Sequence, residues 1–555
     1  MTTWTQDYQP HGSPWWLAAL VAALPVAVLF YCLGVRKTSA PRAAAAGAAT
    51  AILAATLFAG MPWSLALSSF VFGAAYGLLP IGWVVFAAVF LYQIAVDTGQ
   101  FDAMKASIGR LTADRRLQVL LIAFSFGAII EGAAGFGTPV AISAALLVGL
   151  GFRPFSAAVL CLIANTAPVA WGSVGTPLVA LQAVTGLPIA DLSAMNARIL
   201  PITSVIVPIW LIRSMVPWRE TLEVLPAALV CGLSFAVTQF VWGNWIDVGL
   251  VDIVAGLASL GSLAVFLCFW KPRRVWRFPE EAAATSRDLP SGLSPGKVFR
   301  AWLPFLILFV FVIGWGLLRK RLEPHAWASY PIQVPFLHEA VIRTAPVVAV
   351  NEAEKAVFKL QWLSATGTGV VFAAIATSLL LRQGARGLLG SFLGACRRMR
   401  VPLLAITPML GLGYVTRFSG IDAILGLAFT RTGPLYPFFG TFLGWLGVAL
   451  TGSDTASNVL FGSLQRITAE QLGLDPVLMA SANSAGGVMG KMVDAQSIVV
   501  ATAATGKVGD EGKILIAVLW HSIALAAVVA AIVTAYAYLF PGVVPHGVKL
   551  WSAAG

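Results

Sequence analysis

Residues 131–139 read Glu-Gly-Ala-Ala-Gly-Phe-Gly-Thr-Pro and interrupt a long apolar stretch of the chain. Three glycines in this segment remove the side chains that would resist a sharp turn. Thr138 is a suitable N-cap residue, and Pro139 suits the first position of a helix. The segment therefore predicts a break inside the membrane followed by a half-helix, whose N–H groups would face the protein interior and attract an anion.

Residues 451–458, Thr-Gly-Ser-Asp-Thr-Ala-Ser-Asn, form a second break of the same kind. The two breaks occupy equivalent places in an internal repeat, because Leu150–Pro154 matches Leu472–Pro476 at an offset of 322 and Ala164–Ala167 matches Ala482–Ala485 at an offset of 318. A kinked helix would explain either break alone. Their recurrence at matched positions favours a pair of re-entrant hairpins near 131–139 and 451–458, as in secondary transporters with a site at the membrane midplane.

The composition excludes a soluble protein. Of the 555 residues, 58% are hydrophobic and 11% are charged, whereas a soluble chain carries about 25% charged residues. Apolar runs such as 15–34, 42–60 and 514–540 are long enough to cross a hydrocarbon core as helices. We predict an all-α polytopic membrane protein in the lipid bilayer, with roughly 12–14 membrane segments.

The formal charge of +12 is spread over short loops that carry the basic residues, at 36–42, 105–116, 271–277 and 382–400. The positive-inside rule places such loops in the cytoplasm, which argues against a nucleic-acid partner. The N-terminus then lies outside, and segment 80–96 runs inward while its repeat match, 402–418, runs outward. The chain divides into a first half (1–270), a cytoplasmic linker (271–300) and an inverted second half (301–555). Arg319–Arg321 would lie outside, which fits the rule poorly.

Two acids lie in apolar sequence at the predicted hairpins. Burial penalises the charged form of a carboxyl group, so Glu131 and Asp454 are candidates for carrying a proton. Asp454 can equally be a structural acid, because it follows Ser453 at the expected N-terminus of a half-helix. His521 could relay protons, although an interfacial histidine at a helix end is the commoner explanation.

A second pair of breaks is expected near 165–168 and 483–491. Lys491 is the only cation in the apolar stretch 477–492 and could pair with a substrate carboxylate or Asp494, or reach the interface. Asparagine and hydroxyl side chains can bind a small polar ligand or satisfy unwound backbone. Together with Lys491, the candidate substrate-binding residues are Gly135, Gly137, Asn165, Thr166, Ser453, Thr455, Asn458, Asn483 and Ser484.

Signatures of enzymes and of metal or cofactor sites are missing from the sequence. The five cysteines are scattered without a Cys-x-x-Cys pair, which is typical of small buried side chains. Segment 487–492 resembles a phosphate loop only faintly, since Ala485 replaces its first glycine and Met492 its Ser or Thr. We therefore expect no catalytic residues, no metal and no cofactor, and transport that is passive or driven by an ion gradient.

Several long motifs resemble the bacterial L-lactate permease family, which includes glycolate permeases. They are 131–137 (EGAAGFG), 141–151 (AISAALLVGLG), 165–170 (NTAPVA), 442–448 (FLGWLGV), 450–455 (LTGSDT) and 490–492 (GKM), and the similarity extends from Trp4 through the last helix. The resemblance implies a multi-pass protein of the bacterial inner membrane that cotransports L-lactate, glycolate and related 2-hydroxy acids with protons.

This sequence departs from the pattern of that family at Thr138, where the family usually has Ala, and at Asp494, where it usually has Ser. The second departure argues against Asp494 as an essential proton carrier. Arg417 is another unfamiliar charge with no expected role. Two other functions remain open from the residues alone: a sodium-coupled carrier for another carboxylate or oxyanion, and an intramembrane enzyme, which the missing nucleophile and metal signatures disfavour.

Overall fold

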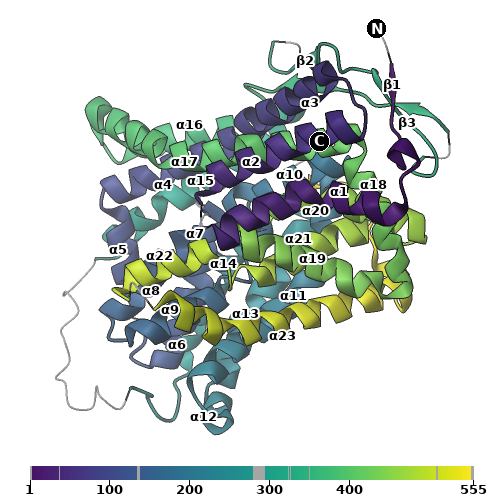
Figure 1. Ribbon diagram of the computed structural model, residues 1–555. Helices are drawn as coiled ribbons and strands as arrows, with labels where there is room; N and C mark the ends of the chain where they lie inside the picture. Colours follow the sequence, from purple (N-terminus) through teal and green to yellow (C-terminus); the bar gives the residue numbers. More distant parts are fainter. Residues whose placement is uncertain are drawn as a thin grey trace.

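The computed structural model describes the chain except residues 1–2, 37, 110, 134, 136–137, 279–293, 323, 326, 349, 508–509 and 552–555. It is a bundle of long, roughly parallel helices (Figure 1). In this described part, nine helices are long and apolar enough to cross a membrane, or up to ten if one bent pair counts as a single span. The prediction of an all-α polytopic membrane protein is confirmed. Several of the 12–14 predicted segments are half-helices or short helices, such as Trp15–Phe30 and Thr138–Gly149.

The described part of residues 1–270 contains fourteen α-helices. Their bounds are α1 Trp15–Phe30, α2 Ala40–Leu53, α3 Trp63–Tyr76, α4 Gly82–Asp97, α5 Gln100–Gly109, α6 Arg115–Val119, α7 Gly127–Ala133, α8 Thr138–Gly149, α9 Pro154–Ala164, α10 Gly172–Thr185, α11 Ile189–Met215, α12 Trp218–Glu223, α13 Leu225–Val241 and α14 Val251–Phe269. The π-helical turn η5 (Leu120–Phe126) joins α6 to α7 without a break.

From residue 294 onward, the residues that the structure describes form nine α-helices and a small strand region. Their bounds are α15 Pro295–Leu322, α16 Thr366–Leu380, α17 Gly384–Ser419, α18 Ile421–Phe429, α19 Tyr436–Thr451, α20 Asp454–Leu472, α21 Pro476–Gly490, α22 Ala495–Thr505 and α23 Glu511–Tyr538. The strands β2 (Tyr330–Gln333) and β5 (Val357–Leu360) pair antiparallel, while β3 (Val341–Arg343) lies between β1 (Trp4–Thr5) and β4 (Glu352–Ala353).

Helix breaks occur in both halves, at the places where the sequence changes from apolar residues to glycine and capping residues. The first hairpin joins α7 to α8, and α8 begins at Thr138 with Pro139 in its first turn. The second joins α19 to α20, whose N-cap Ser453 accepts a hydrogen bond from the Ala456 N–H at 3.3 Å. Helix α9 and the segment Val169–Thr185 form a pair bent by 67°.

The break expected near 483–491 lies only at the end of that range. Helix α21 continues through Gly490, and the turn follows at residues 491–494. The glycines of α21 instead allow close helix packing. A methyl group on Gly486 would overlap the Thr441 carbonyl group, and one on Gly490 would overlap the carbonyl of Trp445, both on α19. Glycine-rich sequence here reflects contact between helices and not an unwound segment.

Two of the basic segments, 105–116 and 271–277, meet at one end of the bundle. Arg116, which is fully buried, forms ion pairs with Asp114 at 2.8 Å and with Glu223 of α12 at 3.2 Å. Its guanidinium group also donates to the carbonyl oxygens of Glu220 and Arg274 at 2.8 and 3.0 Å. These contacts fix the start of the linker beside the α5–α6 connection. We call this end of the molecule the basic end.

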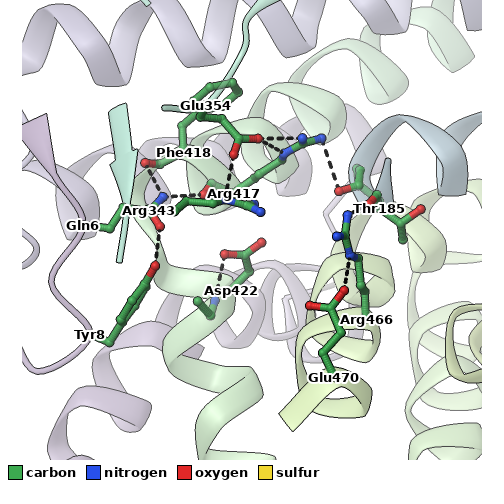
Figure 2. Close-up of polar contacts among 12 residues, drawn as sticks. Gln6, Tyr8, Thr185, Arg343, Glu354, Arg417, Phe418, Asp422, Arg466 and Glu470 are labelled. Atoms are coloured by element: carbon green, nitrogen blue, oxygen red, sulfur yellow. Dashed lines mark hydrogen bonds and ion pairs between the residues drawn. The ribbon is translucent and has the colours of Figure 1, made fainter. Parts of the chain in front are cut away.

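The strands lie at the opposite end, beside the N-terminus (Figure 1). Glu354, which follows β4, forms ion pairs with Arg343 of β3 at 2.7 Å and with Arg417 of α17 at 2.6 Å (Figure 2). Gln6 donates to the carbonyl oxygens of Arg417 and Phe418 at 3.0 and 2.9 Å. We call Gln6, Arg343, Glu354 and Arg417 the strand-end clamp, because they tie both strand segments to the end of α17.

The clamp also holds the C-terminus of α10. Arg417 donates to the Ala183 carbonyl oxygen at 2.9 Å, and Arg466 of α20 donates to that of Thr185 (Figure 2). Cations at a helix C-terminus satisfy its free carbonyl groups and interact favourably with its dipole. Arg417, to which the sequence assigned no role, therefore joins the strand region to a helix whose other end reaches the centre of the molecule.

The clamp should contribute to stability in a pH-dependent way. Although burial acts to raise it, the pKa of Glu354 lies below its usual range because of the guanidinium groups of Arg417 and Arg343. A depressed folded pKa stabilises the protein above the unfolded value of about 4.3, and this contribution is lost as the pH falls through the folded value. We expect Glu354→Gln to cost on the order of 3 kcal/mol at pH 7, because it leaves two largely buried guanidinium groups without their carboxylate.

Thermal unfolding of the detergent-solubilised protein checks this expectation. Glu352→Gln is the matched control, because Glu352 is exposed on the neighbouring strand β4. The difference in midpoint between Glu354→Gln and the parent should persist from pH 8 to pH 5 and shrink below about pH 4. Equal midpoints for the Glu354 and Glu352 variants at pH 7 would show that the clamp adds no stability.

Candidate functional site

A small polar cavity lies where the broken helices meet. Its volume is about 30 Å³, close to the share of one water molecule in liquid water. In this conformation the cavity is therefore too small for an organic acid. It is lined by residues from the ends of α7, α10, α19, α20 and α21: Glu131, Val169, Gly172, Ser173, Thr176, Pro177, Gly452, Ser453, Asp454, Thr455 and Lys491.

Glycines at both hairpin turns adopt backbone conformations that other residues avoid. Gly135 has φ +58° and Gly452 has φ +74°, in the left-handed region where a Cβ atom is costly. The Ser173 hydroxyl also occupies the place that a Cβ on Gly135 would take. Both glycines therefore have a backbone conformation that suits a tight turn. Gly137, the other predicted glycine, lies outside the described residues.

Glu131 is buried at the end of α7, with its carboxyl group directed at the cavity. A Cβ on Gly172 would lie 2.9 Å from Glu131 Oε1, and Oε2 has no hydrogen-bond partner in the described part of the chain. Asn165 lies beside this carboxyl group, and neither of its side-chain polar atoms makes a hydrogen bond with a described residue. The neighbouring Thr166 uses its hydroxyl locally, donating to the Ile163 carbonyl oxygen at 2.7 Å.

Asp454 is more firmly held than Glu131. Its Oδ2 accepts hydrogen bonds from the Ser484 hydroxyl at 2.6 Å and from the Asn458 amide at 3.3 Å. Its Oδ1 has no partner among the residues described. As predicted, the residue follows the cap Ser453 at the start of α20. Oδ2 of Asp454 is thus fixed by the protein, while Oδ1 remains free to accept a hydrogen bond from a ligand or to bind a proton.

Two predicted ligands form a structural network instead of lining the cavity. The Asn483 amide donates to Asn458 Oδ1 at 3.0 Å, and Gln465 donates to Asn483 Oδ1 at 3.3 Å. The Tyr436 hydroxyl donates to Gln465 Oε1 at 2.7 Å. Because these bonds use the polar atoms of both asparagines, the network cross-links α19, α20 and α21.

Lys491 lies at the cavity and does not reach the interface, since its side chain is 4% exposed. It donates to the Gly452 carbonyl oxygen at 2.6 Å and forms an ion pair with Asp494 at 3.1 Å. Asp494 is itself fixed by the Ser497 N–H at 2.6 Å. The pairing with Asp494, one of three predicted alternatives, is the one present in this conformation.

His521 is not brought to the cavity. It is half-buried on α23 and accepts a hydrogen bond from the Trp210 indole at 2.9 Å. No group of three or more His, Cys, Asp or Glu side chains that could hold a metal occurs in the part of the chain that the structure covers.

The start of α10 contributes cavity residues that the sequence analysis missed. Ser173, Val174 and Gly175 have φ values of +47°, +58° and +78°, an unusual left-handed turn for which a β-branched valine is poorly suited. The signal was present, because residues 175–177 (Gly-Thr-Pro) repeat residues 137–139 of the first hairpin. Asp252, a buried acid in the first turn of α14, was missed as well.

Comparisons with known proteins identify the family of the whole chain. The family model described as L-lactate permease matches residues 18–540. The chain is 45% identical to the glycolate permease GlcA of Escherichia coli K12, covering 98% of this chain and 99% of that protein. It is 43% identical to an L-lactate permease of the same organism and 42% identical to one of Bacillus subtilis, covering 98% of this chain and 100% of each of those proteins.

Among solved structures, the YdaH transporter of Alcanivorax borkumensis aligns over 86% of this chain and 88% of that chain, with 14% identity and a TM-score of 0.44. That likeness is too low to carry an argument. The family match and the relatives span nearly the whole sequence, including both hairpins and Lys491. The chain belongs to the L-lactate permease family.

Proposed function

We propose that this protein imports L-lactate and related 2-hydroxy monocarboxylates, such as glycolate, with protons across the bacterial inner membrane. Transport and not catalysis is its activity. The observation that carries the proposal is the cavity, where one buried cation, Lys491, faces the unpartnered carboxyl oxygens of Glu131 and Asp454. Relatives named as L-lactate and glycolate permeases support the substrate class.

A 2-hydroxy acid offers a carboxylate beside a hydroxyl group. Lys491 supplies the cation for the carboxylate, and the N-terminal turn of α20, which begins at the cavity, supplies N–H groups. Ser173 and Thr455 supply hydroxyl groups at the same cavity. Because the cavity holds about 30 Å³, substrate enters only when the broken helices move apart.

Proton coupling follows from the charges around the cavity. Lys491 and Asp494 compensate one another, which leaves Glu131 and Asp454 as further buried acids. An uncompensated buried carboxylate costs several kcal/mol, and a substrate anion beside it would add repulsion. Protonation of Glu131 removes both costs, so proton and substrate bind together. Asp454 has two hydrogen-bond donors and is the second candidate, with His521 after it.

The two halves, 1–270 and 301–555, would alternate access around this cavity. Each half contributes a helix hairpin and a broken helix pair, and the predicted inverted orientation is the arrangement used by many secondary transporters. The breaks at α7–α8 and α19–α20 are the parts that would open to either side.

Sodium is the second candidate for the coupling ion, because carboxyl oxygens and unwound carbonyl groups also coordinate Na⁺ in secondary transporters. Uptake of labelled L-lactate into proteoliposomes decides between them. An imposed pH gradient, acidic on the side of substrate addition, should drive accumulation in sodium-free buffer. Accumulation that follows only a sodium gradient would refute proton coupling.

Glu131→Gln should lose accumulation driven by the pH gradient and retain exchange of internal for external lactate, because glutamine mimics the protonated acid but cannot release a proton. The measurement is pH-driven uptake beside counterflow in the same proteoliposomes. Glu470→Gln is the matched control, since Glu470 forms a partly exposed ion pair with Arg466 away from the cavity. If Glu131→Gln accumulates lactate as well as the parent, the proton is carried elsewhere.

Lys491→Met should weaken substrate binding, but alone it would leave Asp494 buried without its cation. The double variant Lys491→Met/Asp494→Ser removes the ion pair as a unit, and Asp494→Ser alone is the control. We expect KM for L-lactate to rise about 10- to 100-fold in the double variant, the equivalent of one charge-assisted hydrogen bond of about 1.5–3 kcal/mol. The single Asp494→Ser variant should transport normally. Equal KM values in both would show that Lys491 does not bind the carboxylate.

A further inference from the structure

We propose that Asp252 is a second proton-binding group of the transport path, which exchanges a proton with Glu131. This inference rests on the proposed proton coupling and adds a residue to it. Asp252 lies in the first turn of α14 and is fully buried. Neither of its carboxyl oxygens has a hydrogen-bond partner among the described residues.

The first turn of α14 packs directly against the end of α7 that carries Glu131. A Cβ on Gly132 would lie 2.7 Å from Ile253 Cγ1 and 3.0 Å from Asp252 Cβ, so only glycine permits this approach. Asp252 therefore lies against the residue that follows Glu131 in sequence. The carboxyl groups of Asp252 and Glu131 are close enough to interact electrostatically.

The connection that leads into α14 also contacts the left-handed turn of α10. A Cβ on Gly175 would lie 2.8 Å from the Val248 carbonyl oxygen, and one on Gly249 would lie 2.9 Å from Val174 Cγ1. The segment that carries Asp252 is thus wedged between the first hairpin and the turn that brings Ser173 to the cavity. Movement of either element changes the surroundings of Asp252.

Few charges face Asp252. The elements packed against α14 are α7, α10, α13 and η5, and their titratable side chains are Glu131 and Cys231. Cys231 lies near Ser259, two turns further along α14, at 3.2 Å from its hydroxyl. Asp247, in the connection, accepts hydrogen bonds from the N–H groups of Gly249 and Leu250. These packed elements contribute no cation, and Lys491 and Asp494 act on Glu131 from beyond it.

An ionised Asp252 would be a buried carboxylate with neither a donor nor a cation, which costs several kcal/mol. The N-terminal dipole of α14 offsets only part of this cost, about 0.3–1 kcal/mol in exposed cases and up to about 2 kcal/mol when buried. Two neighbouring carboxyl groups also avoid simultaneous ionisation. The two acids are therefore not ionised together. Their oxygens make no hydrogen bond with one another in this conformation, so the proton passes when movement of the surrounding elements brings the carboxyl groups into contact. The O–H bond of the donor acid then breaks as that of the acceptor carboxylate forms, and the donor keeps the negative charge.

This exchange gives Asp252 a defined task. It holds a proton while Glu131 releases its own toward the cavity, and then passes this proton to Glu131. Asp252 is then the ionised member of the pair until Glu131, which lines the cavity, takes up the next proton and returns one to it. The geometry assigns Asp252 to proton handling and not to substrate binding, because it does not line the cavity.

The test compares Asp252→Asn with Asp510→Asn, because Asp510 is a partly exposed acid that forms an ion pair with Lys513 at 2.7 Å. In proteoliposomes, Asp252→Asn should lower pH-driven accumulation of L-lactate about tenfold or more, which corresponds to about 1.4 kcal/mol, and leave counterflow within about twofold of the parent. Asp510→Asn should leave both unchanged. A second readout is the uptake of protons when L-lactate is added to purified protein in weakly buffered solution, which should be smaller for Asp252→Asn.

Each outcome decides the inference. Parent-like accumulation and parent-like proton uptake in Asp252→Asn would overturn it, because Asp252 would then be a permanently neutral structural acid. If the variant loses counterflow as well, its proton uptake on substrate binding decides: a smaller uptake per bound lactate supports the role, and an unchanged one refutes it. If the parent shows no pH-driven accumulation, the proposed coupling itself is wrong. If Glu131→Gln is normal while Asp252→Asn is not, the exchange between the two acids is refuted, and only proton binding by Asp252 itself stands.

Discussion

A peptide group in hydrocarbon must have a hydrogen-bond partner, and the structure of this transporter depends on that constraint. Helices satisfy it along their length, but every helix break leaves free N–H and C=O groups. Such breaks are tolerated only where protein surrounds them. The breaks α7–α8, α9–α10, α19–α20 and α21–α22 therefore lie beside one cavity, and long helices such as α17 and α23 lie on either side of the molecule (Figure 1). The groups that the breaks expose become the lining of the site.

The same constraint explains how much of the site the sequence could predict. The sequence predicted helix breaks at Gly135 and Gly452 and a helix start after Ser453. Turn and cap residues are rare in apolar sequence, and their effect on the backbone is local. The Gly486–Gly490 segment has the same local appearance but contacts α19, and only the packing partner separates the two uses of glycine. Asn458 and Asn483 illustrate the same limit, because their mutual hydrogen bond joins two helices. The membrane class and the helical fold follow from composition and run length, which need no tertiary information.

The buried charges at the cavity must nearly cancel, because an uncompensated charge inside the bundle would destabilise it. Lys491 is the one cation among the cavity residues, and Asp494 already neutralises it. The remaining buried acids have hydrogen bonds in decreasing number: Asp454 accepts two, while Asp252 accepts none from the described residues. The number of hydrogen bonds thus separates Asp454, which the protein fixes in place, from acids such as Asp252, whose protonation can change. The sequence suggested the acids of the hairpins but not Asp252, because its contact with α7 joins segments more than a hundred residues apart.

The attachment of α10 has a mechanical consequence. Arg417 and Arg466 hold its last carbonyl groups at the strand end, while its first turn reaches the cavity through Ser173, Val174 and Gly175. Because the C-terminal end of α10 is held in place, this helix can move mainly at its N-terminal end, beside the cavity. The left-handed turn lies at this free end, and its backbone, which already lies away from the helical minimum, can absorb such a movement. Anchoring residues far from the cavity thereby set the direction in which the cavity widens, and their loss would loosen the barrier against leak before it affected affinity.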